Sequence, residues 1–210
     1  GLQVNRGPQL LAGTSPLVFS EDDSAIAFDP ALALSDPDDT KLSGATVQIE
    51  NYVPVQDVLG FTLVDPDILA SFDNVFGILS FQGSSSVASY ETLLQSITYT
   101  NTSDSPLPLV RTLVITVHDG ALPTQPAVVR RQIGIIIQND APTSLDDAVL
   151  PAILQGTLQP IGRTIGALFA PIVVDVDGGD SLAGIAVVGN TANADIEGAW
   201  EYSTDNITWF

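Results

Sequence analysis

A pattern of residues occurs twice in this chain and constrains its fold more than any single segment does. Each copy runs from a proline-containing joint, through an Asp-x-Asp pair, to a Leu-x-Gly-x-x-Val segment. These elements are Pro8, Asp36-Pro37-Asp38 and residues 42–47 in the first copy, and Pro142, Asp175-Val176-Asp177 and residues 182–187 in the second. Such a repeat predicts tandem domains of one architecture.

The repeat sets the expected domain boundaries. Residues 1–7 correspond to the end of a preceding joint, residues 8–140 to a first repeat, and residues 141–210 to a second repeat that is incomplete at Phe210. The first residues contain neither methionine nor the charged and apolar regions of a signal peptide. We therefore expect this chain to be a segment of a longer protein.

Strand-forming segments dominate the first repeat. Five segments are rich in Val, Ile, Thr, Tyr and Phe, namely residues 45–49, 78–81, 97–100, 112–117 and 127–137. Polar residues interrupt several of them at intervals that suit half-buried antiparallel strands. Turn residues separate them, as in residues 101–106 and 119–123. Many short strands with such spacing predict a β-sandwich.

One segment has helical periodicity instead. Val87, Tyr90, Leu93 and Leu94 recur at helical spacing, and Ser86 precedes them as a candidate N-cap. We expect a short crossover helix here.

The composition narrows the classes of partner. Asp and Glu number 25 against 6 Lys and Arg, giving a formal net charge of −19, while 45% of residues are hydrophobic. An acidic globular chain of this kind repels nucleic acids and anionic membranes, and divalent cations are its natural counterions. With no cysteine in the chain, disulfides and thiolate metal sites are excluded. No stretch approaches the ~18 apolar residues of a membrane-spanning helix, so any anchor lies outside these residues.

Most of the first repeat resembles the cadherin-like repeats of giant bacterial adhesins and other large calcium-binding surface proteins. The segments that carry the resemblance are residues 19–23, 29–36, 97–104, 117–121 and 139–142. Residues 175–184 and 198–205 resemble a different repeat type from the same kind of array. The resemblance implies tandem Ig/cadherin-like antiparallel β-sandwiches in a secreted protein of the extracellular cell surface.

The resemblance also implies calcium sites at the joints. Calcium takes six to eight oxygen ligands, so a site needs carboxylates and carbonyls from more than one segment. The implied ligands are Glu21 and Asp119 from one end of the first repeat, Asn139 and Asp140 from the linker, Asp175 and Asp177 from the second repeat, and the Asp36 and Asp38 pair of the first repeat. An ion shared by two repeats would clamp the joint.

Other acidic residues are left outside this set, because solvated loop charge explains them equally well. They are Asp22, Asp23, Asp39, Asp146, Asp147 and Asp180. Arg6 stands where Asp140 stands in the second joint, which replaces a carboxylate by a repelling charge, and Gln155 replaces the expected Glu near the start of the second repeat. The Asp-rich loops lack the EF-hand glycine.

We expect no enzymatic activity from this segment. His118 is the only histidine, no Gly-x-Ser-x-Gly elbow is present, and zinc would need further His or Cys ligands. Trp200, Tyr202 and Trp209 form a candidate glycan-binding stripe, but the strand-like alternation around Glu201 favours a core position for at least one of the first two.

The expected function is therefore a calcium-rigidified stalk of an adhesin. Its partners would be calcium ions, neighbouring repeats of the same chain, and other copies or a surface ligand. A structural subunit of an extracellular filament or surface layer is the first alternative, and a glycan-binding module is the second.

Overall fold

The computed structural model describes residues 5–120, 125–205 and 207–210. These residues form two compact units, each described by itself below. The first contains the described residues up to 141 together with residues 176–178, and the second contains residues 142–175 and the described residues from 179 onward.

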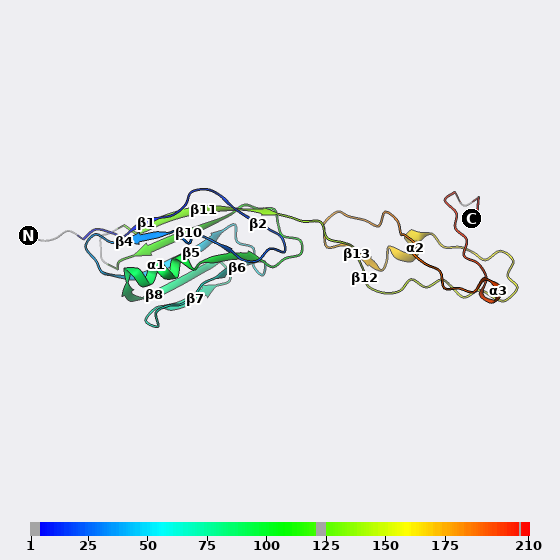
Figure 1. Cartoon of the computed structure of the whole chain (residues 1–210), viewed down its shortest axis with the longest axis horizontal. Coiled ribbons are helices and arrows are strands. Elements are labelled where there is room, and N and C mark those ends of the chain that lie inside the picture. Colours follow the sequence, from blue (N-terminus) through cyan, green and yellow to red (C-terminus); the bar gives the residue numbers. More distant parts are fainter. Residues whose placement is uncertain (1–4, 121–124, 206) are drawn as a thin grey trace, which may run out of the picture. The chain divides into compact units, whose positions relative to one another are not determined.

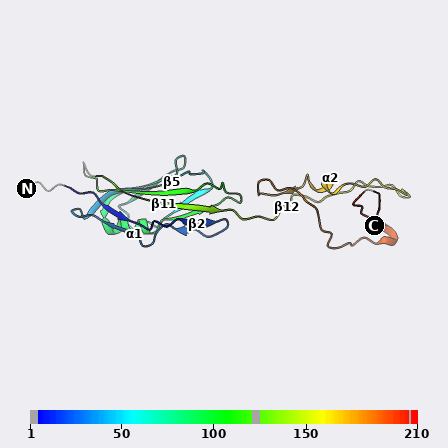
Figure 2. The ribbon, with the colours of Figure 1, turned by 90° about the horizontal axis from the view of Figure 1, so that it is seen from above.

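The first unit is built on a six-stranded sheet (Figure 1). Neighbouring strands are antiparallel except at one edge, where β2 and β11 are parallel and lie side by side (Figure 2). In sheet order the strands are β2 (Leu17–Ser20), β11 (Ala127–Ile136), β10 (Arg111–His118), β5 (Lys41–Glu50), β8 (Ile78–Ser86) and β7 (Leu69–Asp73). Along β5, Ala45, Val47 and Ile49 are buried and alternate with partly exposed residues, as a half-buried strand requires.

Two smaller sheets cover the inner face. One is three-stranded, in the order β3 (Ile26–Ala27), β9 (Thr98–Asn101) and β6 (Asp57–Gly60), and the other pairs β1 (Gln9–Leu11) with β4 (Ala33–Ser35). Phe19 of β2 and Tyr99 of β9 meet edge to face, with ring centroids 5.6 Å apart, and both are fully buried. Because these rings come from different sheets, the core lies between two layers, which makes the unit a β-sandwich.

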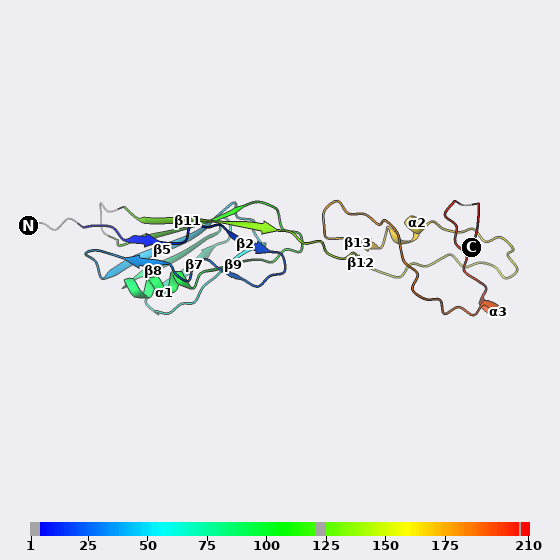
Figure 3. The same cartoon turned by 45° about the horizontal axis from the view of Figure 1, so that its top comes forward.

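Helix α1 (Val87–Gln95) connects the two layers. The Ser86 side chain accepts a hydrogen bond from the Ser89 backbone N–H, which caps the first turn. Tyr90, Leu93 and Leu94 are buried, and the helix lies beside β8 (Figure 3). The helix leads from β8 of the large sheet to β9 of the small one, so the predicted crossover helix and its N-cap are confirmed.

The mostly β fold predicted from the sequence is also confirmed. The five predicted strand segments fall on β5, β8, β9, β10 and β11. Strands β1 to β4, β6 and β7 were not predicted, because they are two to five residues long and show little periodicity. Of the turn predicted at 119–123, residues 121–123 lie outside the described residues.

An ion pair is buried inside the sandwich. Arg111 Nε lies 2.9 Å from Asp57 Oδ2, and both side chains are fully buried. Asp57 also accepts hydrogen bonds from the Tyr99 hydroxyl at 2.6 Å and from Asn101 Nδ2 at 2.9 Å. Burial and the Asp57 carboxylate raise the pKa of Tyr99, so the tyrosine remains a donor. The pair therefore joins β10 of the large sheet to β6 and β9 of the small one.

Replacement of Arg111 by methionine should lower the free energy of unfolding by about 3–5 kcal/mol, because Asp57 would keep a buried charge without its partner. Urea denaturation followed by far-ultraviolet circular dichroism would measure this change. Arg130→Met is the matched control, since Arg130 pairs with Glu50 on the exposed side of the sheet. Its expected cost is below about 1 kcal/mol, and equal costs for the two variants would contradict this account.

The second unit contains little regular structure. Strands β12 (Thr143–Ser144) and β13 (Val173–Val174) form one short pair, and α2 (Ile165–Phe169) and α3 (Ala194–Glu197) are short helices. None of its described residues is a buried hydrophobic one. Trp200 and Tyr202 are each 65% exposed, so the expectation that one of them fills a core was wrong: this unit encloses no core among its described residues. A second β-sandwich stays a prediction.

No helix within the described ranges is long and apolar enough to cross a membrane.

Candidate functional site

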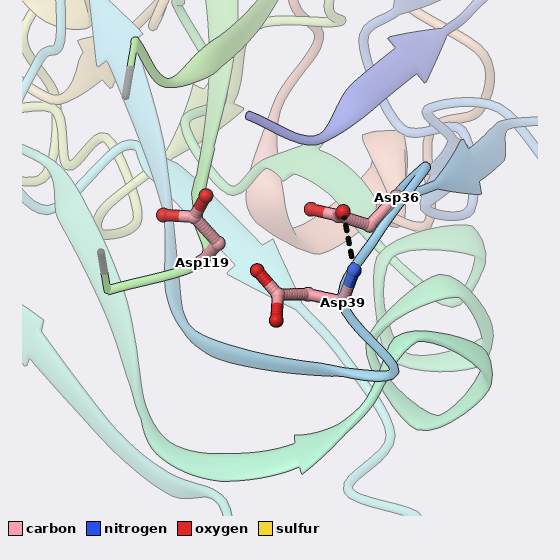
Figure 4. Close-up of side chains that lie close together, drawn as sticks. All are labelled: Asp36, Asp39 and Asp119. Atoms are coloured by element: carbon pink, nitrogen blue, oxygen red, sulfur yellow. Dashed lines mark hydrogen bonds between the residues drawn. The ribbon is translucent and has the colours of Figure 1, made fainter. Parts of the chain in front are cut away.

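Three aspartates meet at one end of the sandwich. Single carboxylate oxygens of Asp36, Asp39 and Asp119 all lie within 4.8 Å of one another, and we call this group the Asp36 cluster (Figure 4). Asp36 and Asp39 belong to the loop between β4 and β5, and Asp119 directly follows β10. Because β10 runs antiparallel to β5, with His118 opposite Gly44, the end of β10 reaches the start of β5.

The loop holds these carboxylates in a defined arrangement. Asp36 Oδ1 accepts hydrogen bonds from the backbone N–H groups of Asp38 at 3.1 Å and Asp39 at 2.9 Å. Asp36 Oδ2 is buried and has no hydrogen-bond partner among the described residues. This oxygen is therefore oriented and available as a cation ligand.

Neighbouring residues complete the surroundings of the cluster. Asn5 Nδ2 donates to Asp119 Oδ2 at 2.8 Å, and the Arg6 backbone N–H donates to both oxygens of Asp38 at 3.1 and 3.3 Å. Partial burial, followed by the charges of Asp36, Asp38 and Asp119, raises the pKa of Asp39. The cluster is therefore a site of unfavourable negative charge.

A second candidate lies at the end of β2. Glu21 is 1% exposed, and its backbone N–H donates to the Ile136 carbonyl at 2.9 Å. Its Oε2 accepts from the Gln138 backbone N–H at 2.8 Å, while Oε1 is buried without a hydrogen-bond partner among the described residues. An ionised carboxylate is costly to bury unless its oxygens are satisfied. A cation or a further hydrogen-bond donor at Glu21 Oε1 would therefore stabilise this buried carboxylate.

One acidic residue, Asp140, lies in the linker that follows β11, and it contacts Asp177 of a later loop. The Asp140 backbone N–H donates to Asp177 Oδ2 at 2.6 Å, and both residues belong to the first unit. Asn139 is exposed, and its Nδ2 donates to the Asp140 carbonyl at 2.8 Å. Within the loop 175–180, carboxylate oxygens of Asp175, Asp177 and Asp180 lie within 4.8 Å of one another.

The structure corrects the expected grouping of Glu21 with Asp119. Glu21 lies beside the end of β11, because β2 is parallel to β11 and Ser20 pairs with Ile136. Asp119 lies near the start of β11, because β10 is antiparallel to it and Val117 pairs with Ala127. The two acidic residues are thus separated by the length of β11, about 30 Å, and cannot share an ion.

Sequence reasoning missed Asp39 and Asp180 as members of acidic clusters. Each lies three residues after a clustered aspartate, Asp36 or Asp177, within a turning loop. Residues at this spacing often face the same side of a turn. A search for Asp at positions i, i+2 and i+3 in turn-rich segments, instead of Asp-x-Asp alone, would have included Asp39.

Fold and site together define a mostly β, sandwich-type domain with oxygen-rich candidate cation sites at both ends. No family model matches the chain. Halomucin from Haloquadratum walsbyi is 28% identical over 110 residues, which is 49% of this chain but only 1% of that protein. A cohesin module from a family 33 glycoside hydrolase of Clostridium perfringens superposes with a TM-score of 0.33 at 14% identity, covering 64% of this chain and 100% of the module. This superposition is too loose to support a functional argument.

We expect the variant Asp39→Asn to have a higher melting temperature than the unmodified chain in chelator, and a lower one in calcium. A carboxyl pKa raised in the folded state means that ionisation of Asp39 disfavours folding near neutral pH, so in chelator the variant should melt at a higher temperature. In millimolar calcium the unmodified chain should gain more, because it keeps the ligand. Differential scanning calorimetry would measure both, with the exposed Asp104→Asn as control; an unchanged rank would count against a cation site at this cluster.

Proposed function

We propose that this chain is a non-catalytic, calcium-binding segment of an exported surface protein, in which bound calcium stiffens the domain ends. The observation that carries the proposal is the Glu21 carboxylate, which is buried at the end of β2 and whose Oε1 has no hydrogen-bond partner within the described part of the chain. The Asp36 cluster supports it independently at the other end of the sandwich, because Asp36 Oδ2 also has no hydrogen-bond partner among the residues that the structure describes.

The ligand chemistry favours calcium over other metals. The candidate ligands are carboxylate, amide and backbone carbonyl oxygens, which hard cations prefer. His118 lies exposed at the end of β10 and is not a member of either acidic cluster, so these clusters lack the nitrogen and sulfur ligands typical of zinc. Calcium tolerates irregular geometry and six to eight ligands, which suits loops that supply oxygens from several segments.

At the Glu21 end, calcium would act on the linker. Gln138 bonds Glu21 twice, through its backbone N–H and through Nε2 to the Glu21 carbonyl at 2.8 Å. An ion on Glu21 Oε1 would recruit further oxygens from the nearby linker, for which Asn139 and Asp140 are the proposed sources. The linker would then lose conformational freedom when calcium binds, which is the proposed basis of a rigid stalk. Asp175 and Asp177 are the proposed ligands beyond the linker.

The similarity to halomucin, a large surface protein, supports an extracellular location for the domain. The matched stretch spans about 1% of halomucin, so the adhesin role and the partners of the whole protein belong to the proposal. The acidic composition also supports an extracellular location, because extracellular calcium is a counterion for the excess carboxylates. Its millimolar concentration fills even weak sites.

Calcium should raise the melting temperature, and a chelator should lower it. Ligand binding to the folded state alone stabilises by RT ln(1 + [L]/Kd), about 2.7 kcal/mol at one hundred times Kd. The variants Glu21→Gln and Asp36→Asn should each remove part of the calcium-dependent rise in melting temperature, because each changes one of two separate candidate sites near opposite ends of β11. Asp104→Asn should leave the shift intact. Superimposable melting curves with calcium and with chelator would remove calcium from the proposal.

A glycan-binding role is a second candidate for the other unit. Trp200 and Tyr202 are each 65% exposed, and Trp209 is 48% exposed. Exposed aromatic rings of this kind can stack on sugar faces. Binding to a carbohydrate array would favour this role if Trp200→Ala abolished the binding and Phe76→Ala preserved it. Phe76 is the control because it is similarly exposed in the sandwich. An absence of binding by the unmodified chain would eliminate this role.

A further inference from the structure

One edge of the six-stranded sheet is open. Strand β7 pairs with β8 on one side only, and no other strand of the described chain pairs with it (Figure 1). Leu69 is 72% exposed and Phe72 is 45% exposed. The strand contains neither proline nor lysine, which natural proteins use to block such edges. It therefore keeps the backbone groups and the apolar side chains that a further strand requires.

The direction of the free backbone groups follows from the hairpin. The Gly77 N–H donates to the Asp73 carbonyl at 2.9 Å, which directs that carbonyl toward β8. Successive residues of a strand alternate in direction, so Ser71 also faces β8, while Ala70 and Phe72 present their N–H and C=O groups to the open edge.

We propose that β7 pairs with β7 of a second copy of this chain, in antiparallel register about a twofold axis at Ser71. Ala70 would then exchange backbone hydrogen bonds with Phe72 of the other copy, and Ser71 would face its own counterpart in a non-hydrogen-bonded pair. The two sheets would become one continuous sheet across the axis.

The side chains on the core-facing side of β7 are complementary in size in this register. Ala70 lies beside Phe81 of β8, and Phe72 lies beside Leu79. In the proposed register the small Ala70 of one copy would lie opposite the large Phe72 of the other. On the outer side, Asp73 would lie opposite Leu69. The two copies of Asp73 would then be about 14 Å apart, which exceeds the screening length of about 8 Å at physiological ionic strength.

Two copies of a chain with a net charge of −19 repel each other, and this register keeps that repulsion small at the contact. Asp73 is the only charged residue within β7, and it lies at the end of the strand, where twofold pairing keeps like charges apart. A five-residue strand forms a small contact, below the ~1,200 Å² of a standard stable interface. We therefore expect weak dimers that form at high concentration or where many copies are held close together.

Cysteine crosslinking tests the pairing in the full chain, which has no cysteine of its own. Ser71→Cys should form a disulfide-linked dimer on mild oxidation, because residues paired across the axis have Cα atoms within disulfide range. Leu69→Cys is the matched control: it lies on the same strand and face, but its counterpart would be about 14 Å away. A mixture of Leu69→Cys and Asp73→Cys chains should instead crosslink to each other.

We expect Ser71→Cys to dimerise about tenfold faster than Leu69→Cys alone, because pairing raises the effective concentration of the thiols. Sedimentation equilibrium provides an independent measurement, in which Ser71→Lys should abolish self-association by placing like charges face to face, whereas Gln82→Lys on β8 should not. Equal oxidation rates for Ser71→Cys and Leu69→Cys, or a chain that stays monomeric at high concentration, would overturn the proposal.

Discussion

Strand direction in the six-stranded sheet decides at which end of the sandwich the candidate ligands Glu21 and Asp119 lie. The antiparallel pairing of β10 with β5 brings Asp119 to the loop that contains Asp36 and Asp39. The parallel pairing of β2 with β11 brings Glu21 to the start of the linker. The sheet thus places Glu21 and the Asp36 cluster at opposite ends of the sandwich, and at the Asp36 cluster the neighbouring carboxylates raise the pKa of Asp39.

The buried pair of Arg111 and Asp57 shows how the same sheet is held to its partner layer. The Arg111 guanidinium lies against the Asp57 carboxylate and supplies the opposite charge that a buried carboxylate requires. Tyr99 and Asn101 satisfy the remaining carboxylate oxygen. The Asp57 carboxylate is therefore buried with both oxygens hydrogen-bonded, whereas Glu21 is buried with one oxygen that has no hydrogen-bond partner among the described residues.

Periodicity in the sequence was sufficient to predict the long elements. Strands β5, β8 and β10 and helix α1 each contain several apolar residues at the correct spacing, and Ser86 marks the start of the helix. Asp36 and Asp119 were each named as candidate ligands, but Asp119 was grouped with Glu21 and not with Asp36, so the Asp36 cluster itself was not predicted. Its third member, Asp39, depends on the turn of the loop, and the position of Asp119 depends on which strand pairs with β10. Neither is visible in local sequence, because strand pairing is a long-range property.

The distribution of aromatic residues gives the two units separate optical signals. Both tryptophans, Trp200 and Trp209, lie in the second unit, whereas Tyr52, Tyr90 and Tyr99 lie in the sandwich. Tryptophan emission would therefore follow events in the second unit, and tyrosine absorbance would largely follow the sandwich. An experimenter could watch either half of this chain respond to an added ion without attaching a label.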